Sequence, residues 1–440
     1  MNYKQTTEYL FTAMPSFQNV GGDAYKPGLE RISSFCRELG DPHLSYPTIH
    51  IAGTNGKGST SNMLASVLRS AGYRVGLFTS PHLRDFRERM RVDGVMISEA
   101  EVVDFVAQHR EAMEAMGLSF FEMTAAMALD FFARSSVDIA VVECGLGGRL
   151  DATNIVSPML SIITNIGLDH TQYLGDTLQK IAAEKGGIIK QNVAVVVGER
   201  GEESDDVFGA IAAERGSSIH FAEDLYSATK RCERNDFQEI TAVDKSGNEE
   251  LFTLDLKGKY QCKNLVTLLT AIDQINAKGG GGNGNGNDNK YNISIPAIAI
   301  AEGLRCVTSS MSLEGRWQQL SAEPRVICDT GHNLHGIKEV TTQLRGEKYR
   351  KLYCVLGFAR DKDLRNILPL FPDDTHFIFT RPAIERAFTI AEIATVAEEL
   401  TLDFEVVDGV RSALNRAIER AAPEDLIFIG GSNFVVAEIL

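Results

Sequence analysis

The sequence predicts an α/β protein built on a doubly wound sheet, and three observations support this prediction. Short β-favouring runs alternate with amphipathic helical segments along most of the 440 residues. Glycine-rich or polar segments follow several of these runs directly, at the strand ends where open α/β sheets bind their ligands. The strand–helix alternation restarts near residue 326 after a stretch of different texture, which predicts a second, smaller domain.

The most informative motif lies between a predicted strand and a predicted helix. Residues 49–52 form the strand, residues 53–59 read Gly-Thr-Asn-Gly-Lys-Gly-Ser, and the helix runs on to Gly72. Glycines let successive N–H groups point inward, the helix N-terminus adds partial positive charge, and Lys57 can reach phosphate oxygens. The spacing differs from the standard P-loop. A plain glycine turn is the alternative, and the strand–helix context favours a phosphate site.

Three other predicted strands end in residues that could bind a cation. Ser80 follows the strand over 75–78, and Pro81 keeps Ser80 out of helical geometry. Glu143 ends a hydrophobic strand, which is the Walker-B arrangement for Mg²⁺. His170 follows the next strand along the chain. Together the three side chains fit a Mg²⁺ shell that also uses phosphate oxygens, although a turn at Ser80 and a structural histidine are the alternatives.

Composition restricts the class of protein. The formal net charge is −15, which argues against general binding to nucleic acid or to anionic membranes. The N-terminus carries no signal pattern, and no run of about 18 apolar residues occurs. Seven scattered cysteines without a CxxC motif indicate reduced thiols. We therefore expect a cytoplasmic protein.

A basic cluster stands out in this acidic chain. Arg84, Arg87, Arg89 and Arg91 lie within eight residues of one another. Such a run is usually a solvated face, which is the favoured interpretation here. Because the run follows a candidate anion site, contact with a substrate carboxylate or phosphate is the alternative. Lys185, on a helix predicted over 178–190, is most simply a surface lysine.

The domain organisation follows from changes in texture. Residues 1–308 are expected to form a P-loop-type doubly wound sheet domain with an N-terminal helical lead-in and an added β-hairpin region near 237–256. Residues 309–440 are expected to form a smaller Rossmann-like α/β domain. The Gly/Asn-rich segment 279–288 predicts a mobile loop.

Several motifs resemble those of the folylpolyglutamate synthase/dihydrofolate synthase family, a branch of the Mur ligases. The glycine loop and the Glu-Cys-Gly-Leu-Gly-Gly-Arg-Leu-Asp-Ala-Thr-Asn run at 143–154 are the most specific. The other matching segments are the run at 24–31, Thr-Ser-Pro-His-Leu at 79–83, Leu-Asp-His-Thr at 168–171, Glu-Lys-Gly-Gly-Ile at 184–188 and Gly-His-Asn at 331–333. Departures occur at Glu314 and Trp317, which flank Gly315-Arg316, and at Thr330.

The resemblance implies an ATP-dependent ligase that adds L-glutamate to dihydropteroate, to reduced folates, or to both, through an acyl phosphate. It implies ATP and Mg²⁺ as cofactors and a monomeric enzyme, with Lys57, a carbamylated Lys185 and His332 in catalysis. By position, the implied nucleotide-binding residues are Gly53, Thr54, Asn55, Gly56, Lys57, Gly58, Ser59, Asn264, Arg316 and Asp329. The implied substrate residues are Phe121, Glu122, Leu150, Asp151 and Ala152, and the implied Mg²⁺ ligands are Ser80, Glu143 and His170.

Two other functions remain open at this stage. A Mur-type ligase acting on a cell-wall precursor would share the nucleotide loop, but the Gly-Leu-Gly-Gly-Arg-Leu-Asp-Ala run is typical of the folate enzymes. An ATP-gated switch without ligase activity would hydrolyse ATP slowly and would be indifferent to pterin and glutamate.

Overall fold

The computed structural model describes residues 1–13, 27–234, 236–279 and 293–440. The chain divides into two compact units, which are described separately below. Unit 1 comprises Met1–Gly167, Thr171–Asp255 and Gln261–Leu313. Unit 2 comprises Leu168–His170, Leu256–Tyr260 and Glu314–Leu440. Two segments discussed above lie partly outside the described residues: residues 24–26 of the family-like run at 24–31, and residues 280–288 of the Gly/Asn-rich segment that was expected to be a mobile loop.

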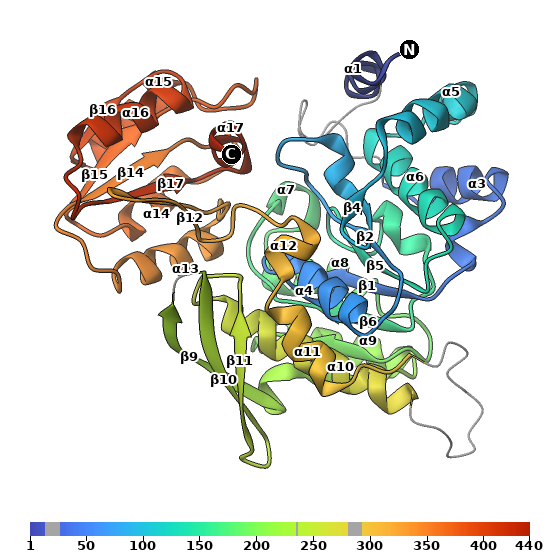
Figure 1. Ribbon diagram of the computed structural model, residues 1–440. Helices are drawn as coiled ribbons and strands as arrows, with labels where there is room; N and C mark the ends of the chain where they lie inside the picture. Colours follow the sequence, from blue (N-terminus) through green and yellow to red (C-terminus); the bar gives the residue numbers. More distant parts are fainter. Residues whose placement is uncertain (14–26, 235, 280–292) are drawn as a thin grey trace. The chain divides into compact units, whose positions relative to one another are not determined.

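Among the described residues of unit 1, eight strands form the main sheet in the order β4-β3-β2-β5-β1-β6-β7-β8. Figure 1 labels β4, β2, β5, β1 and β6 of this sheet. The strands from β2 to β8 in this order pair in parallel, and β3 and β4 add an antiparallel edge. This arrangement confirms the predicted doubly wound sheet. The strands are β1 (Thr48–Ala52), β2 (Val75–Phe78), β3 (Met90–Val92), β4 (Val95–Met96), β5 (Ile139–Glu143), β6 (Leu160–Ile163), β7 (Val195–Val197) and β8 (Ile219–Phe221).

Helices connect these strands, and polar caps define where several of them begin. Ser98 starts α5 and Ser119 starts α6, each in a capping box with the glutamate three residues later. The helices of unit 1 are α1 (Tyr3–Ala13), α3 (Glu30–Glu38), α4 (Lys57–Ser70), α5 (Glu99–Ala115), α6 (Phe120–Arg134), α7 (Thr171–Leu174), α8 (Leu178–Gly186), α9 (Asp205–Glu214), α10 (Gln261–Gly279), α11 (Ala297–Leu304) and α12 (Val307–Met311).

The region of different texture forms a separate antiparallel sheet. The predicted hairpin is present as β10 (Phe237–Asp244) and β11 (Glu249–Leu254). A further strand, β9 (Tyr226–Arg234), pairs with β10 and was not expected from the sequence. Its second half reads Lys-Arg-Cys-Glu-Arg, so it lacks the apolar alternation that identifies a strand.

In the described part of unit 2, six strands form a sheet in the order β12-β13-β17-β14-β15-β16. All neighbours are parallel except β12 with β13, which confirms the predicted smaller α/β domain. The strands are β12 (Gln318–Ala322), β13 (Arg325–Cys328), β14 (Leu352–Leu356), β15 (Thr375–Phe379), β16 (Phe404–Val406) and β17 (Leu426–Gly430). The helices are α13 (Leu334–Leu344), α14 (Leu364–Ile367), α15 (Ile390–Glu399), α16 (Val410–Arg420) and α17 (Asn433–Ile439).

The structure also bears on the state of the cysteines and on membrane-spanning helices. All seven cysteines are free thiols. Within the described ranges, no helix has the length and apolar character needed to cross a bilayer.

Candidate functional site

The glycine loop of unit 1 joins β1 to α4, and two of its glycines have backbone angles that favour glycine. Gly53 has φ +150° and Gly56 has φ +81°. Space is also short, because a Cβ on Gly53 would lie 1.8 Å from Thr164 Oγ1 and one on Gly56 would lie 2.4 Å from Asn264 Oδ1. The loop therefore needs glycine at both positions, as a backbone that approaches a phosphate closely would.

Residues that follow β6 hold this loop in place. The Thr54 amide donates to the Asn165 carbonyl at 2.9 Å, and the Asn55 amide donates to Asn165 Oδ1 at 2.9 Å. The Thr164 hydroxyl donates to the Asn55 carbonyl at 2.6 Å, and the Gly167 amide donates to Thr54 Oγ1 at 3.0 Å. These bonds leave the loop ordered before any ligand is bound.

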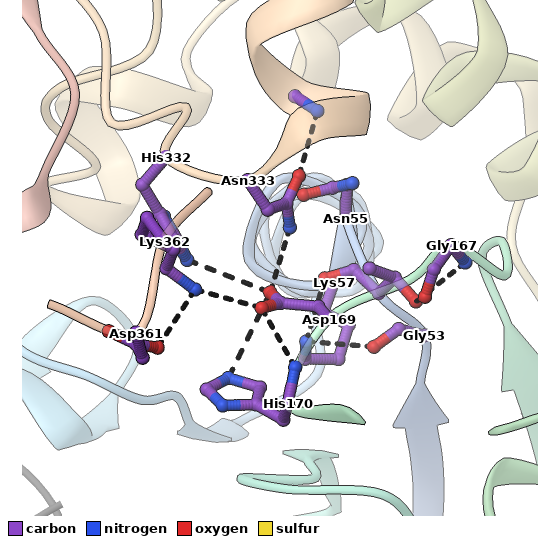
Figure 2. A network of polar contacts seen from close by, with 12 residues as sticks. Gly53, Asn55, Lys57, Gly167, Asp169, His170, His332, Asn333, Asp361 and Lys362 are labelled. Carbon is purple, nitrogen blue, oxygen red and sulfur yellow. Dashed lines mark hydrogen bonds and ion pairs between the residues drawn. The ribbon is translucent and has the colours of Figure 1, made fainter. Parts of the chain in front are cut away.

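Two lysines meet at one carbonyl oxygen inside the loop. Lys57 Nζ donates to the Gly53 carbonyl at 2.9 Å and to the Thr54 carbonyl at 3.2 Å (Figure 2). Lys185 Nζ, at the end of α8, donates to the same Gly53 oxygen at 2.8 Å. Two ammonium groups on one oxygen repel each other, so an anion near them would be strongly favoured.

The position of Lys185 corrects its interpretation as a surface lysine. The residue is only 4% exposed, because α8 packs against α9 and the loop at Gly148 lies directly over the backbone of Glu184 and Lys185. The helical pattern of residues 178–190 did not show this, since a lysine near a helix end is normally solvated.

Two predicted nucleotide residues are linked through α10. Asn264 lies beside Gly56 and donates to Gln261 Oε1 at 2.7 Å, while Gln261 Nε2 donates to Ser59 Oγ at 3.3 Å. Ser59 is 2% exposed. The α10 side chains thus fix the first turn of α4, whose leading N–H groups have no partners within a helix. Gly58 lies in this turn, and its carbonyl accepts from Asn62 Nδ2 at 2.7 Å.

Two of the predicted metal ligands lie together in unit 1. Phe78 pairs with Val142 in the sheet register, so the chain leaves β2 and β5 at the same edge. The Ser80 amide donates to Glu143 Oε2 at 3.3 Å, and Glu143 is buried. Among the described residues, no group of three or more His, Cys, Asp or Glu side chains is arranged to hold a metal ion. A carboxylate and a hydroxyl suit Mg²⁺, which keeps several waters and shares phosphate oxygens.

The predicted substrate residues on α6 lie at its N-terminus. Phe121 is half-buried and its ring contacts the backbone at Gly145, where a Cβ would lie 2.5 Å from Cζ. Glu122 is 2% exposed and accepts from the Ser119 amide at 2.8 Å and from Arg31 Nε at 3.1 Å. The Glu122 carboxylate therefore caps α6 and forms an ion pair with Arg31 of α3. Of Phe121 and Glu122, only Phe121 is partly exposed.

The other substrate segment is folded around Asp151. Its Oδ2 accepts from the amides of Gly145 at 2.9 Å and Leu146 at 2.8 Å, and its Oδ1 accepts from the Thr153 amide and hydroxyl. Burial raises the pKa of this carboxyl group, while the four donors oppose the shift. Asp151 thus closes the glycine-rich turn; Leu150 beside it is half-buried and Ala152 is buried.

The Thr153 hydroxyl belongs to a buried polar network with His50 and Cys144. Because the Thr153 hydroxyl donates to Asp151, it accepts from His50 Nε2, which lies 2.8 Å away on β1. His50 also contacts Cys144 Sγ at 3.1 Å. Burial lowers the pKa of His50 to about 3, so the ring is neutral. No motif in the sequence marks this histidine, and its immediate neighbours Ile49 and Ile51 are apolar.

In unit 2, a buried carboxylate organises the predicted nucleotide residues. Asp329 follows β13 and is 3% exposed. It accepts from Tyr260 Oη at 2.6 Å, from the Trp317 amide at 2.8 Å and from the Gly331 amide at 2.7 Å. Burial raises its pKa, and these donors and the nearby Arg316 oppose the rise. Arg316 itself hydrogen-bonds to Thr330 Oγ1 and to the Gly315 carbonyl.

A second carboxylate of unit 2, Asp169, was missed as a site residue. Asp169 accepts from Asn333 Nδ2 at 2.9 Å and from Lys362 Nζ at 2.8 Å (Figure 2). His332 Nε2 and His170 Nε2 each lie 3.9 Å from Asp169 Oδ2. Burial alone would raise the pKa of Asp169, but His170, Lys362 and His332 hold it below its usual value.

This cluster also determines the tautomer of His332. Its Nδ1 lies 3.0 Å from the Thr330 carbonyl and must donate to it, so Nε2 is the acceptor of the neutral ring. Burial lowers the pKa of His332, which favours that neutral form. Lys362 also pairs with Asp361 at 3.2 Å. The Asp-Lys-Asp triplet at 361–363 after a predicted strand was the available sequence signal for Lys362.

Both parts of the chain match known domains. Residues 51–272 match the Mur ligase middle domain, and residues 315–433 match the Mur ligase, glutamate ligase domain. The dihydrofolate synthase/folylpolyglutamate synthase of Escherichia coli is 30% identical over 99% of this chain and 96% of its own length. A Haloferax volcanii protein named probable bifunctional folylpolyglutamate synthase/dihydropteroate synthase is 34% identical over the whole chain, which covers only 50% of that relative.

Solved structures give the same picture. The Escherichia coli FolC structure in complex with DHPP and ADP superposes with a TM-score of 0.84 at 29% identity, covering 100% of this chain and 97% of FolC. The folylpolyglutamate synthase of Thermotoga maritima has a TM-score of 0.79 at 33% identity, over 99% of this chain and 95% of that protein.

The geometry around Asp151 leads to a stability prediction. In Asp151→Asn, one of the two oxygens becomes an NH₂ group that faces backbone N–H groups, so at least one buried donor loses its acceptor. We expect the free energy of unfolding to fall by about 1–3 kcal/mol in the absence of ligands. Urea unfolding followed by circular dichroism measures this, because the single tryptophan, Trp317, lies in unit 2.

The matched control is Asp176→Asn, which makes the same chemical change at an exposed side chain on the surface of unit 1. It should change the free energy of unfolding by about 0.5 kcal/mol or less. Equal stability of Asp151→Asn and the unmodified protein would contradict the assigned role of Asp151 in closing the turn.

Proposed function

The chain belongs to the dihydrofolate synthase/folylpolyglutamate synthase family of Mur ligases, and from this we propose that it is an ATP-dependent ligase that adds L-glutamate to dihydropteroate, to reduced folates, or to both. One observation supports the proposal most directly: Lys57 donates to the Gly53 and Thr54 carbonyls within a preformed glycine loop at a helix N-terminus. That loop offers backbone donors and positive charge to the phosphates of ATP. A relative with 29% identity, Escherichia coli FolC, is solved in complex with ADP, which supports nucleotide binding by this chain.

The reaction requires activation of a carboxylate, which is a poor electrophile. A carboxylate oxygen of the pterin substrate attacks the γ-phosphorus of ATP, giving an acyl phosphate and ADP. The amine of glutamate then attacks the acyl carbon and loses a proton, and phosphate leaves with the oxygen that came from the carboxylate. In the first step Lys57 and the first turn of α4 would orient and neutralise the phosphates.

Mg²⁺ fits the donors present in unit 1, and we assign Ser80 and Glu143 to it, with His170 as the third ligand implied by the family. When bound, the ion neutralises phosphate charge. The protein's part is to hold the carboxylate of Glu143 buried at the end of β5, beside the Ser80 amide. Lys185 is proposed to be carbamylated, which would replace one of the two clustered ammonium groups with an anion.

The residues of unit 2 are proposed to serve the nucleotide and the amine. Arg316 and Asp329, together with Asn264 of unit 1, are assigned to the nucleotide. Because His332 Nε2 is an acceptor in the neutral ring, it is suited to take the proton that glutamate's amine loses. Asp169, 3.9 Å from that nitrogen, would stabilise the resulting imidazolium.

The pterin substrate is proposed to bind where α6 meets the glycine-rich turn after β5. Phe121 offers an accessible aromatic face, and Leu150, Asp151 and Ala152 form the adjoining turn. Glu122 would act by fixing the α6 N-terminus, because its oxygens already accept from Ser119 and Arg31.

We also propose that the protein is a cytoplasmic monomer, with a functional domain boundary between residues 308 and 309.

Product analysis tests the function. Protein is incubated with Mg-ATP and L-glutamate, with dihydropteroate in one arm and tetrahydrofolate in the other, and ADP and the glutamylated product are quantified. Products in both arms indicate a bifunctional enzyme, and products in one arm name its single reaction. ADP formation that is independent of both pterins would overturn the proposal and favour an ATP-gated switch. Absence of product in both arms, with ATP bound, would overturn it and favour a Mur-type ligase acting on a cell-wall precursor.

The loop lysine is expected to be essential for phosphoryl transfer. Lys57→Ala removes the cation that contacts both the Gly53 and the Thr54 carbonyls. It should lower kcat about 10²–10³-fold, as loss of one transition-state donor does. Steady-state ADP release with saturating substrates measures this effect. Lys180→Ala, on the exposed side of α8, is the control and should retain normal turnover. Near-normal ligation by Lys57→Ala would sink the nucleotide-loop assignment.

The carbamate proposal has its own test. Lys185→Ala should lose most ligase activity, since both the carbamate and its anionic charge are removed, and added acetate or formate should restore part of it. Lys57→Ala provides the contrast, because a small anion cannot replace a cation there. Full activity of Lys185→Ala, or no response at all to small carboxylates, would refute carbamylation.

A further inference from the structure

One member of the basic cluster, Arg89, is buried and incompletely paired. It ends the short 3-10 helix Phe86–Arg89, immediately before β3, and is 3% exposed. Its Nε donates to His82 Nδ1 at 2.7 Å. No further hydrogen bond from its guanidinium group to the described parts of the chain is found. Neither terminal nitrogen of Arg89 is fully shielded from solvent.

The neighbouring arginine of the same helix shows the contrast. Arg87 forms an ion pair with Asp85 at 2.7 Å and approaches Glu99 at 3.6 Å. The negative charges of Glu88 and Glu143 favour the protonated form of Arg89, but neither carboxylate is hydrogen-bonded to it. Burial lowers the pKa of Arg89 to about 10, so the group is still charged at neutral pH, and its charge is poorly solvated. A buried cation of this kind is normally balanced by an anion.

The surroundings indicate which anion fits. The Arg89 guanidinium lies over the Phe120 ring, 5.3 Å from its centroid, at the N-terminus of α6. The next residue, Phe121, presents its ring to the turn at Gly145. The charge of Glu143 also acts on Arg89, and the Glu143 carboxylate accepts from the Ser80 amide. A ligand with an aromatic ring at Phe121 and a carboxylate a short distance away would place that carboxylate between the aromatic residues and the proposed metal ligands.

We propose that Arg89 binds the carboxylate of the pterin substrate, the group that is activated by ATP, through its terminal N–H groups. This inference rests on the proposed function. A guanidinium can hold both oxygens of a carboxylate in a bidentate pair, which orients the oxygen that attacks phosphorus. His82 acts as a positioning residue, because its Nδ1 accepts from Arg89 Nε and leaves the terminal N–H groups for the carboxylate.

The test compares two ligands that differ only in the carboxylate: dihydropteroate and 6-(anilinomethyl)-7,8-dihydropterin. Their dissociation constants, and that of ADP, are measured by calorimetry for the unmodified protein, Arg89→Gln and Arg89→Lys. Arg89→Gln should weaken dihydropteroate binding about 10- to 100-fold. Arg89→Lys keeps the charge but loses the fork of donors, so the loss should be intermediate. Neither variant should change the affinity for the carboxylate-free ligand or for ADP by more than about twofold.

Arg110→Gln, which removes the same charge from an exposed position on α5, should leave all three affinities unchanged. Unchanged dihydropteroate binding in both Arg89 variants would overturn the inference while leaving the proposed function intact. A selective loss of ADP affinity would overturn it too, because Arg89 would then contact nucleotide phosphate. Failure of the unmodified protein to bind either dihydropteroate or tetrahydrofolate would instead contradict the proposed function itself.

Discussion

The close approach of Gly53 to Thr164 is the constraint on which the rest of unit 1 depends. A Cβ at this position would lie 1.8 Å from the threonine hydroxyl, so only glycine lets the loop lie against the end of β6. That contact aims the Gly53 carbonyl at Lys57 and Lys185, and it brings the Asn55 carbonyl within 2.6 Å of Thr164 Oγ1. The positive charge of Lys57, which the proposed chemistry uses, is thus held by the backbone of one loop.

Parallel pairing then assembles the remaining groups. Because β2, β5 and β1 are neighbours and parallel, Ser80, Glu143 and Gly53 all leave the sheet at the same edge. Unit 2 has the same arrangement, since Asp329 directly follows β13 and its carboxylate accepts from the Gly331 and Trp317 amides. In both units, irregular polar backbone at a strand end is stabilised by a buried carboxylate that accepts several N–H donors, Asp151 in one and Asp329 in the other.

Much of this was predictable where a local pattern carries the information. Strand–glycine loop–helix order identified the β1–α4 loop, and a hydrophobic run ending in an acid identified Glu143. The failures have non-local causes. Lys185 looks like a solvated helix residue until α9 and the loop at Gly148 cover it. Asp169 and Lys362 lie 193 positions apart, and only folding brings them to 2.8 Å. Arg89 and Arg87 are alike in sequence and differ only in what surrounds them.

The measurement that tests the account most directly follows oxygen from substrate to product. Dihydropteroate labelled with ¹⁸O in its carboxylate is incubated with the protein, Mg-ATP and L-glutamate, and the phosphate formed is examined by ³¹P NMR. Ligation through an acyl phosphate predicts one ¹⁸O atom in each phosphate released, because the leaving oxygen comes from the carboxylate. Unlabelled phosphate accompanying ADP would contradict the account, since ATP would then have been hydrolysed by water.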